Sequence, residues 1–330
     1  MRQGGIGAAA PRAWPGGAPL AVPTGEEAVR GLAIVALGYA VISLADATVK
    51  WVMPLTGPAV AMIWRGLFGG LAVLLLSRGR ALRAVNRPLL LARSLLSAGV
   101  SAAWYLAWSL GVSLADSYAV AAASPLLMTL LAIPLLGERV GWRRWCSTAV
   151  GCAGVLFMLQ PGGELWRWES ALLLAATAVM ALTRIWTRML TRTDTPDSMA
   201  FWVLAAQAPV GLALLAWPAM GPPAASTGAA GGLLPPLWAL AMLAGFALLN
   251  ALAQILFGRG YALAPVSAIA PFEYTPLLWG IGLGFLLWGE VPAWTTLGGA
   301  AVVVAAGLYN VHRERVRRAE ERAARLRAGG

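Results

Sequence analysis

Long apolar runs, separated by short polar and basic segments, occupy most of the chain between residues 31 and 310. A helix that crosses a bilayer needs about 20 mostly apolar residues. Ten runs approach that length, and because the fifth is short, nine or eleven spans remain alternatives. The predicted spans, with ends uncertain by a few residues, are Gly31–Val49, Pro58–Ser77, Leu89–Leu110, Ser117–Leu136, Trp145–Leu159, Glu169–Leu190, Ser198–Trp217, Leu237–Phe257, Ala264–Trp288 and Pro292–Tyr309.

Composition agrees with a membrane protein. Hydrophobic residues make up 59% of the 330 residues and charged residues only 12%, whereas a soluble domain carries about 25% charged residues. Residues 1–30, rich in Gly, Ala and Pro, are predicted to be a disordered tail. No small-residue cleavage site follows the first span, so we expect it to be retained.

The basic residues predict the orientation. The net charge of +11 could indicate nucleic-acid binding, but the arginines stand beside apolar runs. With a cytoplasmic N-terminus, most of the 25 basic residues fall in cytoplasmic segments, and Lys50 and Arg167 fall on the outer side. Such a bias is typical of cytoplasmic flanks in membrane proteins. We therefore predict no nucleic-acid partner, an inner-membrane location and two cytoplasmic termini.

The chain contains an internal repeat. Residues 44–52, LADATVKWV, align with residues 182–190, LTRIWTRML, and residues 111–121, GVSLADSYAVA, align with residues 260–270, GYALAPVSAIA. Five spans per half would make the halves enter the membrane from opposite sides, as in alternating-access transporters. The predicted fold is therefore all-α, with ten transmembrane helices in two inverted five-helix repeats. The expected divisions are a tail at 1–30, repeats at 31–160 and 161–310, and a basic cytoplasmic tail at 311–330.

Several motifs resemble a known family. SPLLMTLLAIPLLGERVGWRRW with the following GCAGVLFMLQPG, APVSAIAPFEYTPLLWGIGLGFLLWGEVP, ADATVKW and Trp64-Arg65-Gly66 are similar to the EamA-type branch of the drug/metabolite transporter superfamily. The resemblance covers about residues 30–312. It implies ten helices in an inverted arrangement, cytoplasmic termini and solute transport, with amino acids and S-adenosylmethionine among the solutes of the branch.

Glu273 is the first candidate site residue, because it lies between Pro271 and Pro276 inside an apolar run. Proline removes a backbone donor and disrupts the preceding helical turn, and freed backbone groups are tolerated in a membrane only against protein or a wet cavity. We predict a broken helix that lines a transport cavity. The alternative is that Glu273 pairs with an arginine and holds two helices together.

Other ionisable residues inside the spans must pair, face water or act in transport. Asp46 and Lys50 share a helix face by i,i+4 spacing, which predicts either a mutual salt bridge or a switch. Arg65 is the expected partner of Asp46 or Glu273, and Arg184 is expected to reach the membrane surface along its apolar stem.

A pocket with aromatic walls and a few amides would suit a small amphipathic solute; the alternative for the tryptophans is an interfacial belt. Glu138 and Glu290, at equivalent span ends, are expected to cap helices or lock a gate. The complete cavity prediction is Asp46, Lys50, Arg65, Trp104, Tyr105, Trp108, Tyr118, Asn250, Gln254, Glu273 and Tyr274, with helix breaks at Pro125, Pro271 and Pro276.

These patterns predict a secondary transporter of small metabolites that exports amino acids or related solutes by alternating access. The alternative is uptake or exchange of S-adenosylmethionine or a nucleotide-like solute. No GxxxxGK[ST] loop is present, so a gradient or exchange would supply the energy. No nucleophile–base pair or metal-ligand cluster indicates an enzyme, and neither a metal nor a cofactor is predicted. The sequence leaves the solute, the transport direction, proton coupling and the oligomeric state open, with a monomer as one option.

Overall fold

The computed structural model describes residues 25–136, 142–159, 168–216, 233–264 and 269–328. Within these ranges every regular element is a helix. In chain order they are α1 (Gly25–Leu76), η1 (Arg80–Leu82), α2 (Arg87–Ser109), α3 (Leu114–Ala121), α4 (Ser124–Leu136), α5 (Trp142–Leu159), α6 (Trp168–Leu190), α7 (Pro196–Ala205), α8 (Gln207–Leu215), α10 (Leu237–Leu263), η2 (Ala270–Tyr274), α12 (Thr275–Trp288) and α13 (Trp294–Ala328).

Five of the described helical stretches are long and apolar enough to cross a membrane. They are Val29–Leu76, Arg87–Ser109, Trp168–Leu190, Pro196–Leu215 and Leu237–Leu263, and three shorter apolar helices accompany them. The all-helical prediction is thereby confirmed for the described residues, these five stretches are candidate membrane spans, and the count of ten spans stays a prediction.

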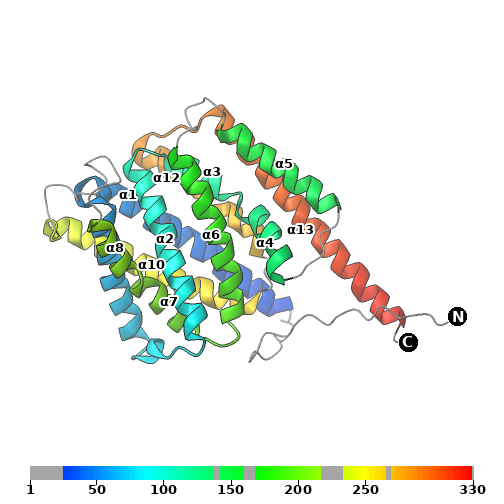
Figure 1. Cartoon of the computed structure of the whole chain (residues 1–330), viewed down its shortest axis with the longest axis horizontal. Coiled ribbons are helices and arrows are strands. Elements are labelled where there is room, and N and C mark those ends of the chain that lie inside the picture. The colour runs from blue at the N-terminus through cyan, green and yellow to red at the C-terminus, as the bar shows by residue number, and fades with distance from the viewer. Residues whose placement is uncertain (1–24, 137–141, 160–167, 217–232, 265–268, 329–330) are drawn as a thin grey trace.

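The first two predicted spans are joined in the single element α1. Its 52 residues would extend about 78 Å if straight, more than twice the roughly 30 Å of a bilayer core. Gly57 interrupts the helix with φ 70° and ψ 166°, between Pro54 and Pro58. A positive φ is accessible to glycine at little cost, and Figure 1 shows the two parts of α1 running in different directions.

Two other predicted spans are also broken. The fourth is divided into α3 and α4 at Ala122–Ala123, with Pro125 as the second residue of α4. The described part of the ninth consists of the 3₁₀ turn η2 and then α12, in which Pro276 is the second residue. Proline is tolerated in the first helical turn because that turn's N–H groups have no intrahelical partner.

Small residues permit close helix contacts in the bundle. The α5 and α13 helices lie side by side at one edge (Figure 1). A Cβ on Gly299 of α13 would lie 2.6 Å from the Gly154 carbonyl oxygen of α5. Such contacts exclude larger side chains and are common between membrane helices.

One predicted tail requires correction in part, and the other is helical. Residues 25–30 are helical, and only residues 1–24 of the predicted disordered tail lie outside the described residues. The predicted tail at 311–330 is, as far as Ala328, a continuation of α13. Runs of Glu and Arg are good helix formers, so the helix that begins as an apolar span extends into its charged flank.

Candidate solute cavity

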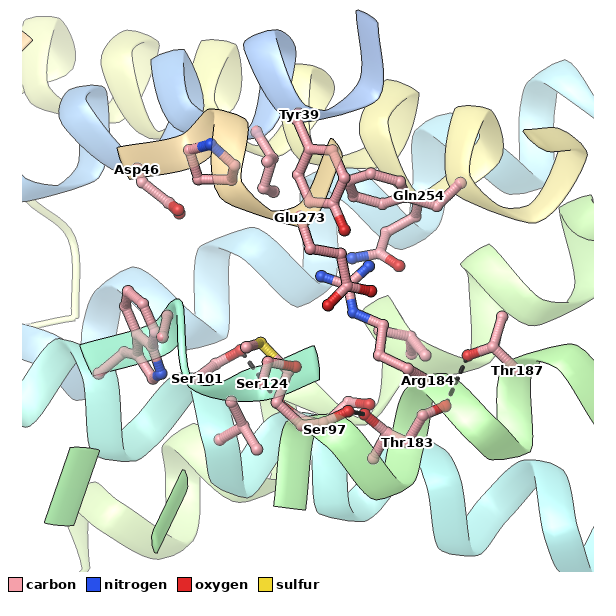
Figure 2. Close-up of a pocket in the computed structure, with 18 of the residues that line it drawn as sticks. Tyr39, Asp46, Ser97, Ser101, Ser124, Thr183, Arg184, Thr187, Gln254 and Glu273 are labelled. Carbon is pink, nitrogen blue, oxygen red and sulfur yellow. Dashed lines mark hydrogen bonds between the residues drawn. The ribbon is translucent and has the colours of Figure 1, made fainter. Parts of the chain in front are cut away.

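A cavity of about 180 Å³ lies inside the bundle. Its walls come from α1, α2, α3, α4, α6, α7, α8, α10, η2 and α12, so both predicted halves contribute. Figure 2 shows Tyr39 and Glu273 on one side of it and Thr183, Arg184 and Thr187 of α6 on the opposite side.

The structure brings most of the predicted site residues to this cavity. Those that line it are Asp46, Arg65, Trp104, Tyr105, Trp108, Tyr118, Gln254, Glu273 and Pro276. Those that do not are Lys50, Asn250, Tyr274, Pro125 and Pro271. Tyr274 is buried against α13, where a Cβ on Gly307 would lie 1.5 Å from its hydroxyl oxygen.

Arg65 organises one end of the cavity. Its Nη1 donates to the hydroxyls of Ser101 and Tyr105, both at 2.9 Å, and its Nη2 donates to Asn250 Oδ1 at 2.8 Å. Asn250, although outside the lining, therefore fixes the position of the guanidinium. The expected pairing of Arg65 with Asp46 or Glu273 is wrong, because all its hydrogen-bond partners here are neutral.

Aromatic rings form the wall beside Arg65. Trp104 and Trp108 are 7% and 5% exposed, so neither belongs to an interfacial belt. Their rings meet edge to face with centroids 5.6 Å apart, and Trp104 also packs on Tyr118 at 5.7 Å. Trp108 Nε1 donates to Ser117 Oγ at 2.9 Å. These contacts hold the rings in fixed orientations.

Each cavity carboxylate accepts a tyrosine hydroxyl. Tyr118 donates to Asp46 at 2.7 Å, and Tyr261 donates to Glu273 at 2.9 Å. Arg184 Nη1 donates to the same Tyr261 hydroxyl at 3.4 Å, so Tyr261 bridges Arg184 and Glu273 without a direct ion pair. The predicted helix break near Glu273 is therefore present, whereas the alternative, a direct pair between Glu273 and an arginine, is not formed among the described residues.

Arg184 does not extend to the membrane surface as expected. Its guanidinium lies 5.4 Å from the Tyr39 ring centroid and 5.2 Å from that of Phe257, and Figure 2 shows it extending from α6 toward Glu273. Cation–π contacts of this length favour a positive charge next to aromatic faces. Arg184 is therefore a cavity residue.

Lys50 and Glu290 form a separate contact beyond the cavity. The Lys50 Nζ lies 2.6 Å from Glu290 Oε1, and Glu290 Oε2 accepts the Leu114 backbone N–H at 3.0 Å. The predicted Asp46–Lys50 salt bridge is not formed, because Asp46 accepts from Tyr118 on α3 and Lys50 contacts Glu290 in the segment after α12. The alternative, a switch, stays a prediction. Glu138, the predicted counterpart of Glu290, lies outside the described residues.

Sequence reasoning overlooked several lining residues, and helical periodicity was the available signal. On α2, Arg93, Ser97, Ser101 and Tyr105 recur at intervals of four and all line the cavity. Residues four apart share one helix face. Tyrosine was a second signal, since four of the chain's six line the cavity: Tyr39, Tyr105, Tyr118 and Tyr261.

A bundle of apolar helices that encloses a polar and aromatic cavity is the arrangement expected of a small-solute transporter, and comparisons with known proteins agree. The chain is 32% identical over 302 residues to a riboflavin transporter of Rhizobium johnstonii, covering 89% of this chain and 95% of that protein. The chain therefore belongs to the family of membrane transporters that includes this protein.

Other relatives are more distant. A pseudopaline exporter of Pseudomonas aeruginosa is 26% identical over 279 residues, covering 83% of this chain and 94% of that protein. An S-adenosylmethionine uptake transporter of Rickettsia bellii is 26% identical over 211 residues, covering 63% and 68%. These names agree with the expectation that the chain is not an enzyme.

A solved crystal structure shares the fold, with a TM-score of 0.58 at 17% identity, covering 86% of this chain and 96% of that chain. No family model matches the chain.

Proposed function

We propose that this protein is a secondary transporter that moves a small planar heteroaromatic solute, similar to riboflavin, by alternating access. The observation that carries the proposal is the buried cavity whose walls combine Trp104, Trp108 and Tyr118 with hydrogen-bonding and charged groups. Flat aromatic walls suit a planar ring system, because stacking on aromatic side chains contributes about 1–3 kcal/mol per ring. The riboflavin transporter of R. johnstonii, with nearly full coverage, supports the same solute class.

The proposed architecture is ten spans in two inverted repeats, residues 31–160 and 161–310, in the inner membrane with both termini cytoplasmic. Equivalent positions of the two aligned halves support it. Asp46 aligns with Arg184, and Tyr105 with Gln254. All four line the cavity, as expected for a site between repeats.

We assign the Lys50–Glu290 ion pair to an outer gate. Lys50 follows the first predicted span on the outer side, and Glu290 joins α1 to the segment after α12 across 240 residues of sequence. The cavity of about 180 Å³ is smaller than the roughly 300–1,000 Å³ of ordinary ligand pockets. Loading a flavin-sized solute would therefore require the walls to separate, as alternating access provides.

Two other solute assignments stay open as predictions. Export of amino acids, the first expectation from sequence, is untested. Uptake or exchange of S-adenosylmethionine is the second candidate, and its support is the similarity to the R. bellii transporter. The adenine ring of that solute could use the same aromatic walls.

Flux through proteoliposomes tests the proposal. Vesicles with purified protein would be loaded with riboflavin, S-adenosylmethionine or labelled amino acids, and efflux and uptake followed with and without a pH gradient. Riboflavin flux should exceed that of empty vesicles and fall about five- to 150-fold in Trp104→Ala, the equivalent of 1–3 kcal/mol of lost stacking. The matched control is Trp294→Ala, because Trp294 is 87% exposed. If only amino acids were transported, the proposed heteroaromatic solute would be refuted and amino-acid transport would take its place.

A further inference from the structure

Arginines outnumber carboxylates in the cavity. Three arginines, Arg65, Arg93 and Arg184, line it, against the two carboxylates Asp46 and Glu273. With both carboxylates ionised, one positive charge is left over. Arg65 is 5% exposed and Arg93 is 7% exposed, so bulk water does not balance it.

None of these arginines forms an ion pair within 4.0 Å among the described residues. The ion pair between Lys50 and Glu290 lies elsewhere. Arg65 donates to three neutral groups, and each carboxylate accepts a tyrosine hydroxyl. A charge inside a membrane protein without a paired partner costs several kcal/mol, so binding of a group of opposite charge would stabilise these arginines.

Arg93 and Arg184 mark where that group would bind. Arg93 Nε donates to Thr187 Oγ1 at 2.8 Å, and Thr187 follows Arg184 by three residues on α6, so the two arginines converge on one part of the wall. Among the described residues, Arg93 Nη1 donates a single hydrogen bond, to the Met199 carbonyl oxygen at 3.4 Å. Within the same residues the Arg184 guanidinium donates a single hydrogen bond, to the Tyr261 hydroxyl, also at 3.4 Å. Both guanidiniums therefore keep donor capacity for a stronger acceptor.

Hydroxyl groups surround the same place. Ser97, Thr183 and Thr187 line the cavity there, and Figure 2 shows them together with Arg184. Planar guanidinium groups recognise carboxylate and phosphate oxygens through paired N–H donors. A wall with two arginines and three hydroxyls has the composition of a site for an anionic oxygen group.

We propose that the transported solute carries a carboxylate or phosphate that binds between Arg93 and Arg184, while its ring system stacks near Trp104. This inference rests on the proposed function for the ring and adds a negative charge to the solute. It disfavours a solute without an anionic group. S-adenosylmethionine carries a carboxylate that could bind between the two arginines, but its sulfonium and ammonium groups would meet the surplus positive charge.

Riboflavin and riboflavin 5′-phosphate are a matched pair of probes, because they differ only in the anionic group. Binding to the purified full-length protein would be measured by quenching of the flavin's own fluorescence. The phosphate should bind about ten- to 100-fold more tightly, as expected for charge-assisted hydrogen bonds. A 5′-carboxylate analogue of riboflavin would be compared with the phosphate. Tighter binding of one of the two would show whether the site prefers a carboxylate or a phosphate.

Two variants should change the preference for riboflavin 5′-phosphate over riboflavin in opposite directions. Arg184→Gln should remove most of the preference for the phosphate, whereas Glu273→Gln, which deletes the nearest negative charge and keeps an acceptor for Tyr261, should increase it. A purely structural role for both residues would weaken binding of both flavins in both variants, and that result would overturn the inference.

The remaining outcomes separate this inference from the proposed function. If riboflavin binds as tightly as its phosphate or more tightly, the anion site is refuted and the flavin-like solute class stands. If neither flavin binds, that solute class is refuted, and inorganic phosphate then decides the anion site. Phosphate should raise the melting temperature of the wild type more than that of Arg184→Gln, and equal shifts would overturn the site.

Discussion

The ion pair between Lys50 and Glu290 should control access to the cavity from the outer side, and Lys50→Met tests this. The substitution removes the charge, keeps much of the side-chain volume and leaves the Glu290–Leu114 hydrogen bond of 3.0 Å in place. It also removes the contact of the Lys50 Nζ with the Trp288 ring, 5.0 Å from its centroid. We expect the closed gate to lose stability relative to the open one.

The burial of the Lys50–Glu290 pair determines how much free energy the closed gate should lose when the pair is broken. The Lys50 and Glu290 side chains are 11% and 21% exposed, which places the pair between two limits. Exposed pairs contribute about 0–1 kcal/mol, and breaking a fully buried pair costs about 3–5 kcal/mol. An intermediate value of about 1–3 kcal/mol corresponds to a five- to 150-fold increase in the outward-open population.

Labelling of a cavity cysteine measures that population. Ser124 lines the cavity, and its hydroxyl is buried with no partner among the described residues, so Ser124→Cys is a mild probe. The native Cys146 and Cys152, both exposed, would first be replaced by alanine. A membrane-impermeant maleimide added to intact cells should then label Cys at position 124 about five- to 150-fold faster in Lys50→Met.

The charge-exchanged variant Lys50→Glu with Glu290→Lys is the matched control, and its labelling should return toward the wild-type rate. An unchanged labelling rate in Lys50→Met with folded protein present would refute the reasoning. Equally fast labelling in the exchanged variant would show that an ion pair alone is not sufficient to hold the gate, since the exchange also removes the Glu290–Leu114 hydrogen bond.

The remaining predictions concern the cavity itself. In Gly280→Ala the new Cβ would lie 2.3 Å from Tyr118 Cδ2, so the Tyr118 ring must move and its hydrogen bond to Asp46 must weaken. Flux through proteoliposomes should therefore fall about tenfold or more. The control is Gly282→Ala, which should retain flux because nothing lies within 4 Å of its new Cβ. Glu273→Gln keeps a hydrogen-bond acceptor and loses the charge, so turnover should fall while expression and melting temperature persist; loss of folded protein would instead indicate a structural pair. Arg65→Lys replaces a guanidinium with three hydrogen bonds by a single ammonium, and thermal unfolding should show a loss of about 1–3 kcal/mol; an unchanged melting temperature would contradict the role given to this network.

The sequence was sufficient to predict helices because the membrane imposes a length and an apolar composition on each span. The prediction of Glu169–Leu190 matches α6, which begins one residue earlier at Trp168. Proline was equally informative, since Pro276 lies where α12 begins. Such local rules depend only on neighbours in the chain, so a single sequence contains them.

Charge partners were not predictable in the same way. The i,i+4 rule paired Asp46 with Lys50, but their actual partners are 72 and 240 residues away. In an isolated helix the near neighbour would be favoured, whereas the folded chain places Tyr118 2.7 Å from Asp46 and Glu290 2.6 Å from Lys50. Arg65 likewise finds Asn250 across 185 residues. Such contacts depend on tertiary packing, which periodicity does not specify.

Helical periodicity in the sequence nevertheless indicates more of the cavity residues than the site prediction contained. The stripe Arg93, Ser97, Ser101 and Tyr105 on α2 is visible at intervals of four inside an otherwise apolar helix. A polar stripe in a membrane span must face protein or water. Arg93 lies close to the start of its predicted span, a position typical of a basic cytoplasmic flank, and its burial is evident only from the packing of α2 against α6.

The two kinds of charge contact suggest a division of tasks within the protein. In the cavity, tyrosine hydroxyls, a serine and an amide hold the charged groups, whereas at the proposed gate Lys50 and Glu290 contact each other directly. A neutral hydrogen bond contributes about 0.5–1.5 kcal/mol, so a solute can replace one with its own polar group at little cost. A partly buried ion pair resists separation more strongly and favours one closed state. Exchangeable bonds therefore suit the part of the protein that must accept and release a solute, and the ion pair suits the part that must stay closed until the helices move.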